Sequence, residues 1–143
     1  MASDGLPSGT YYVTHVQSGK VLDLTGSSVQ PNTPLIVYII LKSYASVFSR
    51  QWILEKEGDI YTFQTSLANV FARASVHTPG KGIVIGRVER FEVLEQEIGQ
   101  YRIKVRDQNL VWTIDNASTP NVILEPSGVT PNGDLWSFEE ISS

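Results

Sequence analysis

Two pairs of glutamates are the side chains best suited to acid–base chemistry in this sequence. Glu55 and Glu57 recur as Glu95 and Glu97, and one residue separates the members of each pair. In a β-strand this spacing places both carboxylates on one face, as acid–base catalysis by paired carboxylates requires. The simpler interpretation, which we favour, is that both pairs are strand-end charges in equivalent positions of a repeated unit.

The two histidines, His15 and His77, give no stronger indication of catalysis. Neither lies in a His-Glu-x-x-His or Gly-x-Ser-x-Gly motif, and we expect both to be solvated loop residues. The segment Gly80-Lys81-Gly82 lacks the rest of a phosphate-binding loop and the helix that follows one. The sequence therefore predicts a protein that is not an enzyme, with no catalytic residue, no metal site and no cofactor.

A loop that contains two prolines is the first candidate for binding, since binding residues concentrate on loops carried by a rigid scaffold. Pro31 and Pro34 fix two φ angles and favour extended conformations at Gln30 and Thr33. A stiff, extended segment loses little entropy on binding and suits the cleft of a protease. The alternative is an ordinary proline-rich turn. The predicted binding loop consists of Ser27, Ser28, Val29, Gln30, Pro31, Asn32 and Thr33.

The elements that must position this loop form a weak internal repeat of about 40 residues. Short strand-like segments alternate with Gly, Pro and Asn turn signals, and no helical periodicity is sustained. Three copies of four strands predict an all-β protein with a β-trefoil fold, which has twelve strands in three pseudo-threefold repeats. We place the repeats at 9–58, 59–99 and 100–143 of a single domain, 1–143.

Several positions recur in phase across the copies, and the first two of the sets below are expected to pack in the core. Each large buried side chain stabilises the fold by roughly 1.5–3 kcal/mol. The sets that we align are Tyr11, Tyr61 and Tyr101; Leu22, Phe71 and Trp112; 35–37, 83–85 and 122–124; and Trp52, Glu92 and Trp136.

Two features near residue 40 suggest contacts with other proteins. The loop 42–49 offers Tyr44 and Phe48, aromatic side chains of the class enriched in interfaces; alternatively, they cover the open end of the barrel. The segment before it is apolar at every position from 35 to 41, although a strand with one solvated face should alternate. Ile36, Tyr38 and Ile40 would form an exposed apolar stripe, from which we predict a homodimer. The alternative is that the loop 42–49 of the same chain covers the stripe.

The composition excludes several classes of partner. The net charge is −4 and Lys and Arg do not cluster, so we predict no binding to nucleic acid. No apolar run approaches 18 residues, so no membrane partner is expected either. The chain has no cysteine and its first residues lack a signal-peptide pattern, which predicts a cytoplasmic protein or one released by a non-classical route.

The segments 18–26, 32–35 and 51–52 resemble one repeat of a ricin-B-type trefoil. The segments 110–115 and 135–138 are similar to the small fungal trefoil proteins of mushrooms, which include lectins and the protease inhibitors called mycocypins, mycospins and cocaprins. Small size, acidic charge and absence of cysteine make the chain most similar to the cocaprins. That resemblance implies reversible inhibition of papain-like cysteine proteases and of aspartic proteases, with the loop 27–33 occluding the cleft.

The resemblance to ricin-B-like lectins implies carbohydrate binding as the alternative function. Asp23 and Gln51 of the first copy match the polar residues of such a site. Trp112 and Trp136 of the third copy are the candidates for a non-classical sugar site.

Overall fold

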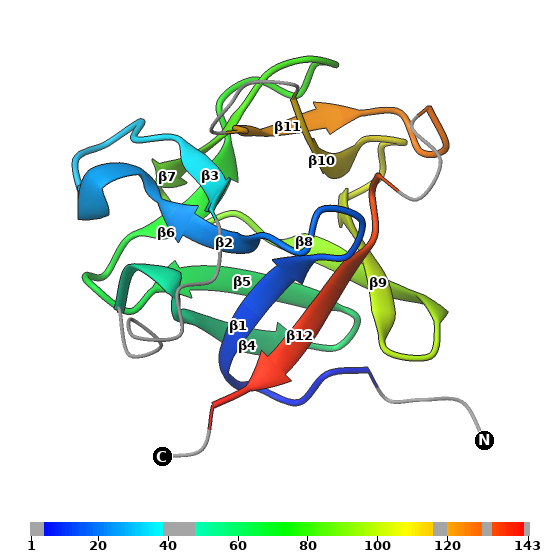
Figure 1. Ribbon diagram of the computed structural model, residues 1–143, viewed down its shortest axis with the longest axis horizontal. Helices are drawn as coiled ribbons and strands as arrows, with labels where there is room; N and C mark the ends of the chain where they lie inside the picture. The colour runs from blue at the N-terminus through cyan, green and yellow to red at the C-terminus, as the bar shows by residue number, and fades with distance from the viewer. Residues whose placement is uncertain (1–4, 39–47, 116–119, 130–132, 142–143) are drawn as a thin grey trace.

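The computed structural model describes residues 5–38, 48–115, 120–129 and 133–141, and this part of the chain forms twelve antiparallel β-strands with two short 3-10 helices (Figure 1). The first repeat consists of β1 Gly9–His15, β2 Val21–Leu24, η1 Thr25–Ser27, β3 Leu35–Tyr38, η3 Phe48–Arg50 and β4 Trp52–Glu57. The second consists of β5 Ile60–Thr65, β6 Phe71–Ala74, β7 Ile83–Gly86 and β8 Phe91–Glu97. The third consists of β9 Gln100–Val105, β10 Val111–Ile114, β11 Val122–Glu125 and β12 Trp136–Glu140.

Strand pairing confirms the β-trefoil. The first and fourth strands of each repeat pair around the barrel, in the order β12, β1, β4, β5, β8, β9 and back to β12. The second and third strands of each repeat form a hairpin at the other end, as Figure 1 shows for β2–β3, β6–β7 and β10–β11. The turns before β5 and β9 are equivalent, and each places a glycine at positive φ, Gly58 at 63° and Gly99 at 79°.

The pseudo-threefold core corrects two of the alignments made from the sequence. Strand pairing places Tyr11 opposite Trp52, Tyr61 opposite Phe91 and Tyr101 opposite Trp136. The residue of the second repeat that is equivalent to the two tryptophans is therefore Phe91 and not Glu92. The sequence alone permits this one-residue error in alignment, because Val93 and Leu94 are both apolar and either could face inward. In the structure Val93 is buried and Leu94 is only half-buried.

The same slip affects the second strand of the second repeat. The register pairs Val21 with Thr14, Phe71 with Gln64 and Val111 with Lys104. Phe71 is therefore equivalent to Val21, and Ala72 is the mate of Leu22 and Trp112. Leu22, Ala72 and Trp112, the three equivalent residues, are all fully buried.

The segment before β1 closes one end of the barrel. The hydroxyl of Tyr11 donates to the carbonyl of Pro7 at 2.6 Å, and that of Tyr61 donates to the carbonyl of Leu6 at 2.7 Å. Leu6 also packs against the core. Burial, reinforced by Glu140, raises the pKa of Tyr11 from 10.0 to about 12, and burial also raises the pKa values of Tyr61 and Tyr101.

These shifts predict that the protein loses stability at alkaline pH. Because the folded pKa of Tyr11 exceeds the unfolded value, its contribution is fully present below pH 10.0 and is lost as the pH rises towards about 12. Urea unfolding at several pH values should show this loss, and Tyr11→Phe should reduce it. Tyr38→Phe, at an exposed ring, is the control. A stability that stays constant from pH 10 to pH 12 would contradict the prediction.

Candidate functional site

The outer face of the β2–β3 hairpin carries a charged and an aromatic side chain together. Alternation along β2 turns Leu22 and Leu24 into the core and Asp23 to the other face. Asp23 is opposite Ile36 and Val21 is opposite Tyr38, so these four side chains share one face of the hairpin. Tyr38 is 40% exposed, in contrast to the three buried residues that precede it in β3.

Arg50, the last residue of η3, lies against Asp23. Its Nε donates to Asp23 Oδ2 at 3.1 Å, while the backbone N–H of Leu24 donates to Asp23 Oδ1 at 2.8 Å. The guanidinium carbon lies 5.7 Å from the centroid of the Tyr38 ring, within the range of a cation–π contact. We call Asp23, Tyr38 and Arg50 the first-repeat site.

The ion pair of the first-repeat site is largely withdrawn from water. The side chain of Arg50 is 9% exposed and that of Asp23 is 12% exposed. A carboxylate has about four lone-pair sites, so Asp23 can accept a further bond beside the two that it already accepts. The site therefore joins a mostly buried, charged hydrogen-bonding pair to an aromatic side chain that is 40% exposed.

The other two repeats do not reproduce this combination. The strand registers give the equivalents of each position. Asp23 corresponds to Arg73 and Thr113, Tyr38 to Gly86 and Glu125, and Arg50, two residues before the strand-4 aromatic, to Glu89 and Asp134. Among the three copies, the first alone joins a carboxylate at the second strand to an aromatic ring at the third.

The predicted binding loop 27–33 is a compact turn. The N–H of Thr33 donates to the carbonyl of Gln30 at 3.2 Å, and Asn32 has a φ of 69°. Proline at the second position and a left-handed residue at the third are typical of a type II turn, which asparagine tolerates. The segment is therefore not extended throughout, because the chain turns at Pro31 and Asn32.

The turn is nevertheless strongly braced. The hydroxyl of Thr33 lies 2.7 Å from the carbonyl of Gln30 and 3.1 Å from the hydroxyl of Ser28. Asn32 N–H donates to the carbonyl of Ile85 at 2.9 Å, and Ile85 N–H donates to the carbonyl of Thr33 at 3.0 Å, so the loop is tied to β7. Its tip from Val29 to Asn32 is exposed. The side chain of Ser27 lies outside the description.

The remaining candidates for a sugar site are the two buried tryptophans and Gln51. Trp112 and Trp136 are fully buried, because the barrel core takes both rings, so neither offers a ring face to a sugar. Gln51 is half-buried, and its carbonyl accepts a bond from Ser66 N–H at 3.1 Å. The structure pairs Asp23 with Arg50, the residue just before Gln51. Sequence reasoning missed Arg50, and its position directly before Gln51-Trp52 was the signal available.

The predicted interface residues are only partly described. Tyr44, Ile40 and the side chain of Phe48 lie outside the described residues. Ile36 is 9% exposed, because its strand bridges to Asn121 in the third repeat. Of the predicted stripe, Tyr38 alone is exposed in the described part, and the homodimer stays a prediction.

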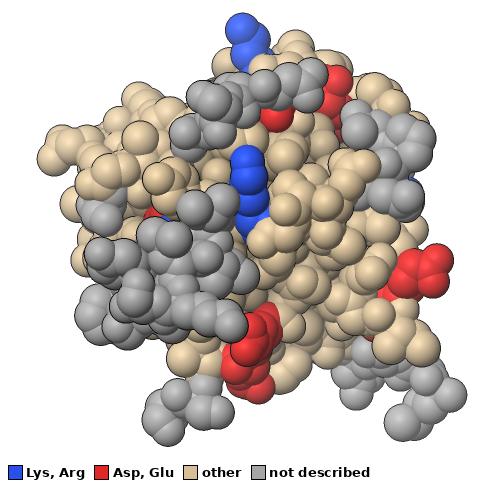
Figure 2. All heavy atoms as spheres, in the orientation of Figure 1, with Lys and Arg blue, Asp and Glu red and all other residues tan. Residues whose placement is uncertain are grey.

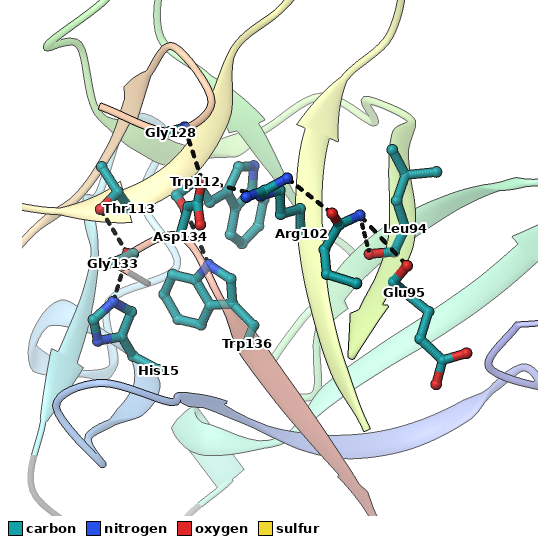
Figure 3. Close-up of polar contacts among 11 residues, drawn as sticks. His15, Leu94, Glu95, Arg102, Trp112, Thr113, Gly128, Gly133, Asp134 and Trp136 are labelled. Carbon is teal, nitrogen blue, oxygen red and sulfur yellow. Dashed lines mark hydrogen bonds and ion pairs between the residues drawn. The ribbon is translucent and has the colours of Figure 1, made fainter. Parts of the chain in front are cut away.

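His15 differs from its expected place in a solvated loop. It is fully buried, because it ends the inward-facing series of β1, and its ring lies 5.0 Å from that of Trp136. Its Nε2 donates to the carbonyl of Gly133 at 2.7 Å, which also accepts from the hydroxyl of Thr113 at 2.7 Å (Figure 3). Burial lowers the pKa of His15 from 6.5. This network holds the segment before β12 and is structural. His77 is exposed and pairs with Glu89.

Other kinds of site are not evident in the described residues. They contain no group of three His, Cys, Asp or Glu side chains placed to hold a metal ion. None of their helices has the length and apolarity needed to cross a membrane. Figure 2 shows Lys and Arg scattered, with no basic cluster on the face that it draws.

Comparisons with known proteins support the fold. No protein-family model matches the chain. The structure is similar to the designed threefold-symmetric protein ThreeFoil, with a TM-score of 0.82, 16% identity, and coverage of 93% of this chain and 99% of that one. It is also similar to the Rhizoctonia solani agglutinin, with a TM-score of 0.83, 21% identity, and coverage of 98% and 100%.

A third similar structure is the Macrolepiota procera ricin B-like lectin in complex with lactose, with a TM-score of 0.78, 19% identity and 99% coverage of both chains. At these identities the likeness shows the fold alone. The chain is therefore a β-trefoil that shares its architecture with fungal lectins.

Proposed function

We propose that the protein binds carbohydrate through the first-repeat site. The observation that carries the proposal is the combination of a carboxylate with an exposed aromatic ring, which the first repeat alone possesses among the three described copies. An aromatic ring presents a flat apolar surface to the C–H face of a sugar. The carboxylate of Asp23 and the guanidinium of Arg50 supply acceptors and donors for the hydroxyl groups.

The ion pair also orients the site. Arg50 fixes Asp23 from one side and lies over the Tyr38 ring, so a ligand meets groups that are already in place. Pre-organised groups lose less entropy when a ligand binds. Similarity of fold to an agglutinin and to a lactose-bound lectin supports the same function.

Tyr38→Ala is the variant that tests this proposal. We expect it to weaken sugar binding about thirtyfold, because truncating an aromatic side chain central to a binding site costs about 2 kcal/mol. A glycan array with the wild-type protein identifies the ligand, and calorimetry with lactose and the best array ligand measures the loss.

Leu67→Ala is the matched control, since Leu67 is 37% exposed but lies in the turn after β5 of the second repeat. Equal affinities for wild type and Tyr38→Ala would remove the first-repeat site from the proposal. Silence of the wild-type protein on neutral and acidic glycans would remove carbohydrate binding itself.

The braced loop favours protease inhibition as a second candidate function. A stiff, exposed turn resists the distortion that cleavage requires, and the tip from Val29 to Asn32 can reach a cleft. The described loop has no Lys or Arg, so trypsin, whose specificity pocket contains a carboxylate, should be spared. The target would be a papain-like cysteine protease or an aspartic protease.

The double replacement Pro31→Gly with Asn32→Gly tests this second function. It removes the fixed φ of Pro31 and loosens the turn, so we expect weaker inhibition of papain with the fold retained. Residual activities of papain, pepsin and trypsin, titrated with the wild-type and loop-variant proteins, are the measurement. Full papain and pepsin activity at high micromolar wild-type protein would exclude this function.

A further inference from the structure

A cavity distinct from the first-repeat site opens between the second and third repeats. Its volume is 280 Å³. Three connections line it: the β6–β7 loop with His77, the β7–β8 connection with Val88 to Arg90, and the β9–β10 turn with Arg106 and Gln108. The volume lies just below the roughly 300–1,000 Å³ of pockets for drug-sized ligands, which suits a smaller molecule.

The single carboxylate in the cavity lining already interacts with two groups of the protein. Glu89 Oε1 accepts the backbone N–H of Ala74 at 2.9 Å, and its Oε2 lies 2.7 Å from His77 Nε2. Each oxygen therefore already has one partner from the second repeat. A ligand entering the cavity meets a carboxylate whose charge is partly compensated by these donors.

Arg90 and Arg106, the two arginines that line the cavity, have hydrogen-bond donors that the described residues do not use. Arg90 is held through Nε by Glu57 Oε2 at 2.5 Å. The side chain of Arg106 makes no hydrogen bond or ion pair with any residue of the described part. A guanidinium carries five N–H donors and no acceptor, so the unmet hydrogen-bonding capacity on the cavity wall consists mainly of charged donors.

We propose that this cavity binds a small organic oxyanion. Arg106, with Arg90 beside it, would donate charge-assisted hydrogen bonds to a carboxylate or a sulfate group, which a guanidinium matches in geometry. Val88, which is 46% exposed, provides an apolar wall for the body of the ligand, and Gln108 can bond to its hydroxyl groups. An acidic monosaccharide unit combines these features.

The proposal is tested by titrating the protein with sodium glucuronate, glucose 6-sulfate and neutral glucose at low ionic strength. Backbone NMR shifts at residues 88–90 and 106–108 should follow one or both charged sugars, and their pattern distinguishes carboxylate from sulfate. Arg106→Gln should weaken that binding about tenfold. The proposal would be overturned if neutral glucose caused chemical-shift changes as large as those of the charged sugars, or if neither charged sugar caused any.

Two variants separate this site from general charge effects and from the first-repeat site. Arg87→Gln removes the same charge from an exposed residue that does not line the cavity, and it should bind almost as well as wild type. An equal loss in Arg87→Gln and Arg106→Gln would overturn the assignment. Tyr38→Ala should leave this binding unchanged, so the outcome does not depend on the proposed carbohydrate function.

Discussion

Asp23→Ala is expected to destabilise the folded protein by about 3–5 kcal/mol, because it leaves the charge of Arg50 buried without a partner. The Arg50 side chain is only 9% exposed and its Nε bond to Asp23 is the contact that compensates its burial. The backbone N–H of Leu24 loses its acceptor as well. Urea unfolding followed by tryptophan fluorescence measures the loss as a lower midpoint.

A double variant distinguishes this mechanism from a general intolerance of change at β2. Asp23→Leu with Arg50→Met replaces the ion pair by apolar side chains of similar size, and such exchanges are often neutral or stabilising. We expect the double variant to recover most of the stability that Asp23→Ala loses, while it still lacks the carboxylate that a sugar needs. If Asp23→Ala is as stable as wild type, the ion pair is not the buried contact described here.

Recovery of stability without recovery of binding would separate the two roles of Asp23. The carboxylate holds Arg50 in place, and it also supplies an acceptor at the edge of the Tyr38 ring. Replacing a buried ion pair by apolar side chains is often neutral or stabilising, so stability alone does not account for Asp23 and Arg50. An apolar pair would be as stable but could not bind a hydroxyl group.

The fold was predictable because its signal is periodic. Alternation placed Tyr11, Tyr61 and Tyr101 on the inward face, and all three are buried. The third strands at 35–37, 83–85 and 122–124 were aligned in the register that the structure shows. Alignment slipped by one residue in the second repeat, where adjacent apolar residues such as Val93 and Leu94 leave the inward face ambiguous.

The candidate site was less predictable because it depends on contacts between distant residues. Asp23 was recognised, but its partner Arg50 lies 27 residues away, and no local pattern connects them. The turn at 30–33 depends on a left-handed Asn32, which two flanking prolines do not reveal. The exposure of Tyr38 was expected from the sequence, and its ring is 40% exposed. The sequence left open whether Trp112 and Trp136 reach the surface, and the structure encloses both.

Trp136→Ala is expected to have the largest effect in the core, a loss of about 3–5 kcal/mol. The Trp136 ring is fully buried and packs edge-on against His15 and Trp112. Its Nε1 also donates to the carbonyl of Trp112 at 3.0 Å (Figure 3). Alanine therefore creates a cavity and leaves a buried carbonyl without that donor, and thermal or urea unfolding should show both losses together.

Phenylalanine at the same position separates the two losses. Trp136→Phe keeps most of the ring and removes the N–H donor, so we expect a smaller loss, with about 1 kcal/mol of it from the hydrogen bond. Phe91 occupies the equivalent position of the second repeat, which shows that the fold accommodates this ring there.

Trp52→Phe is the matched control, since Trp52 Nε1 donates to the carbonyl of Leu22 at 3.2 Å. Similar losses at positions 52 and 136 are expected if pseudo-threefold symmetry governs the energetics as well as the geometry. A Trp136→Phe variant as unstable as Trp136→Ala would contradict that account.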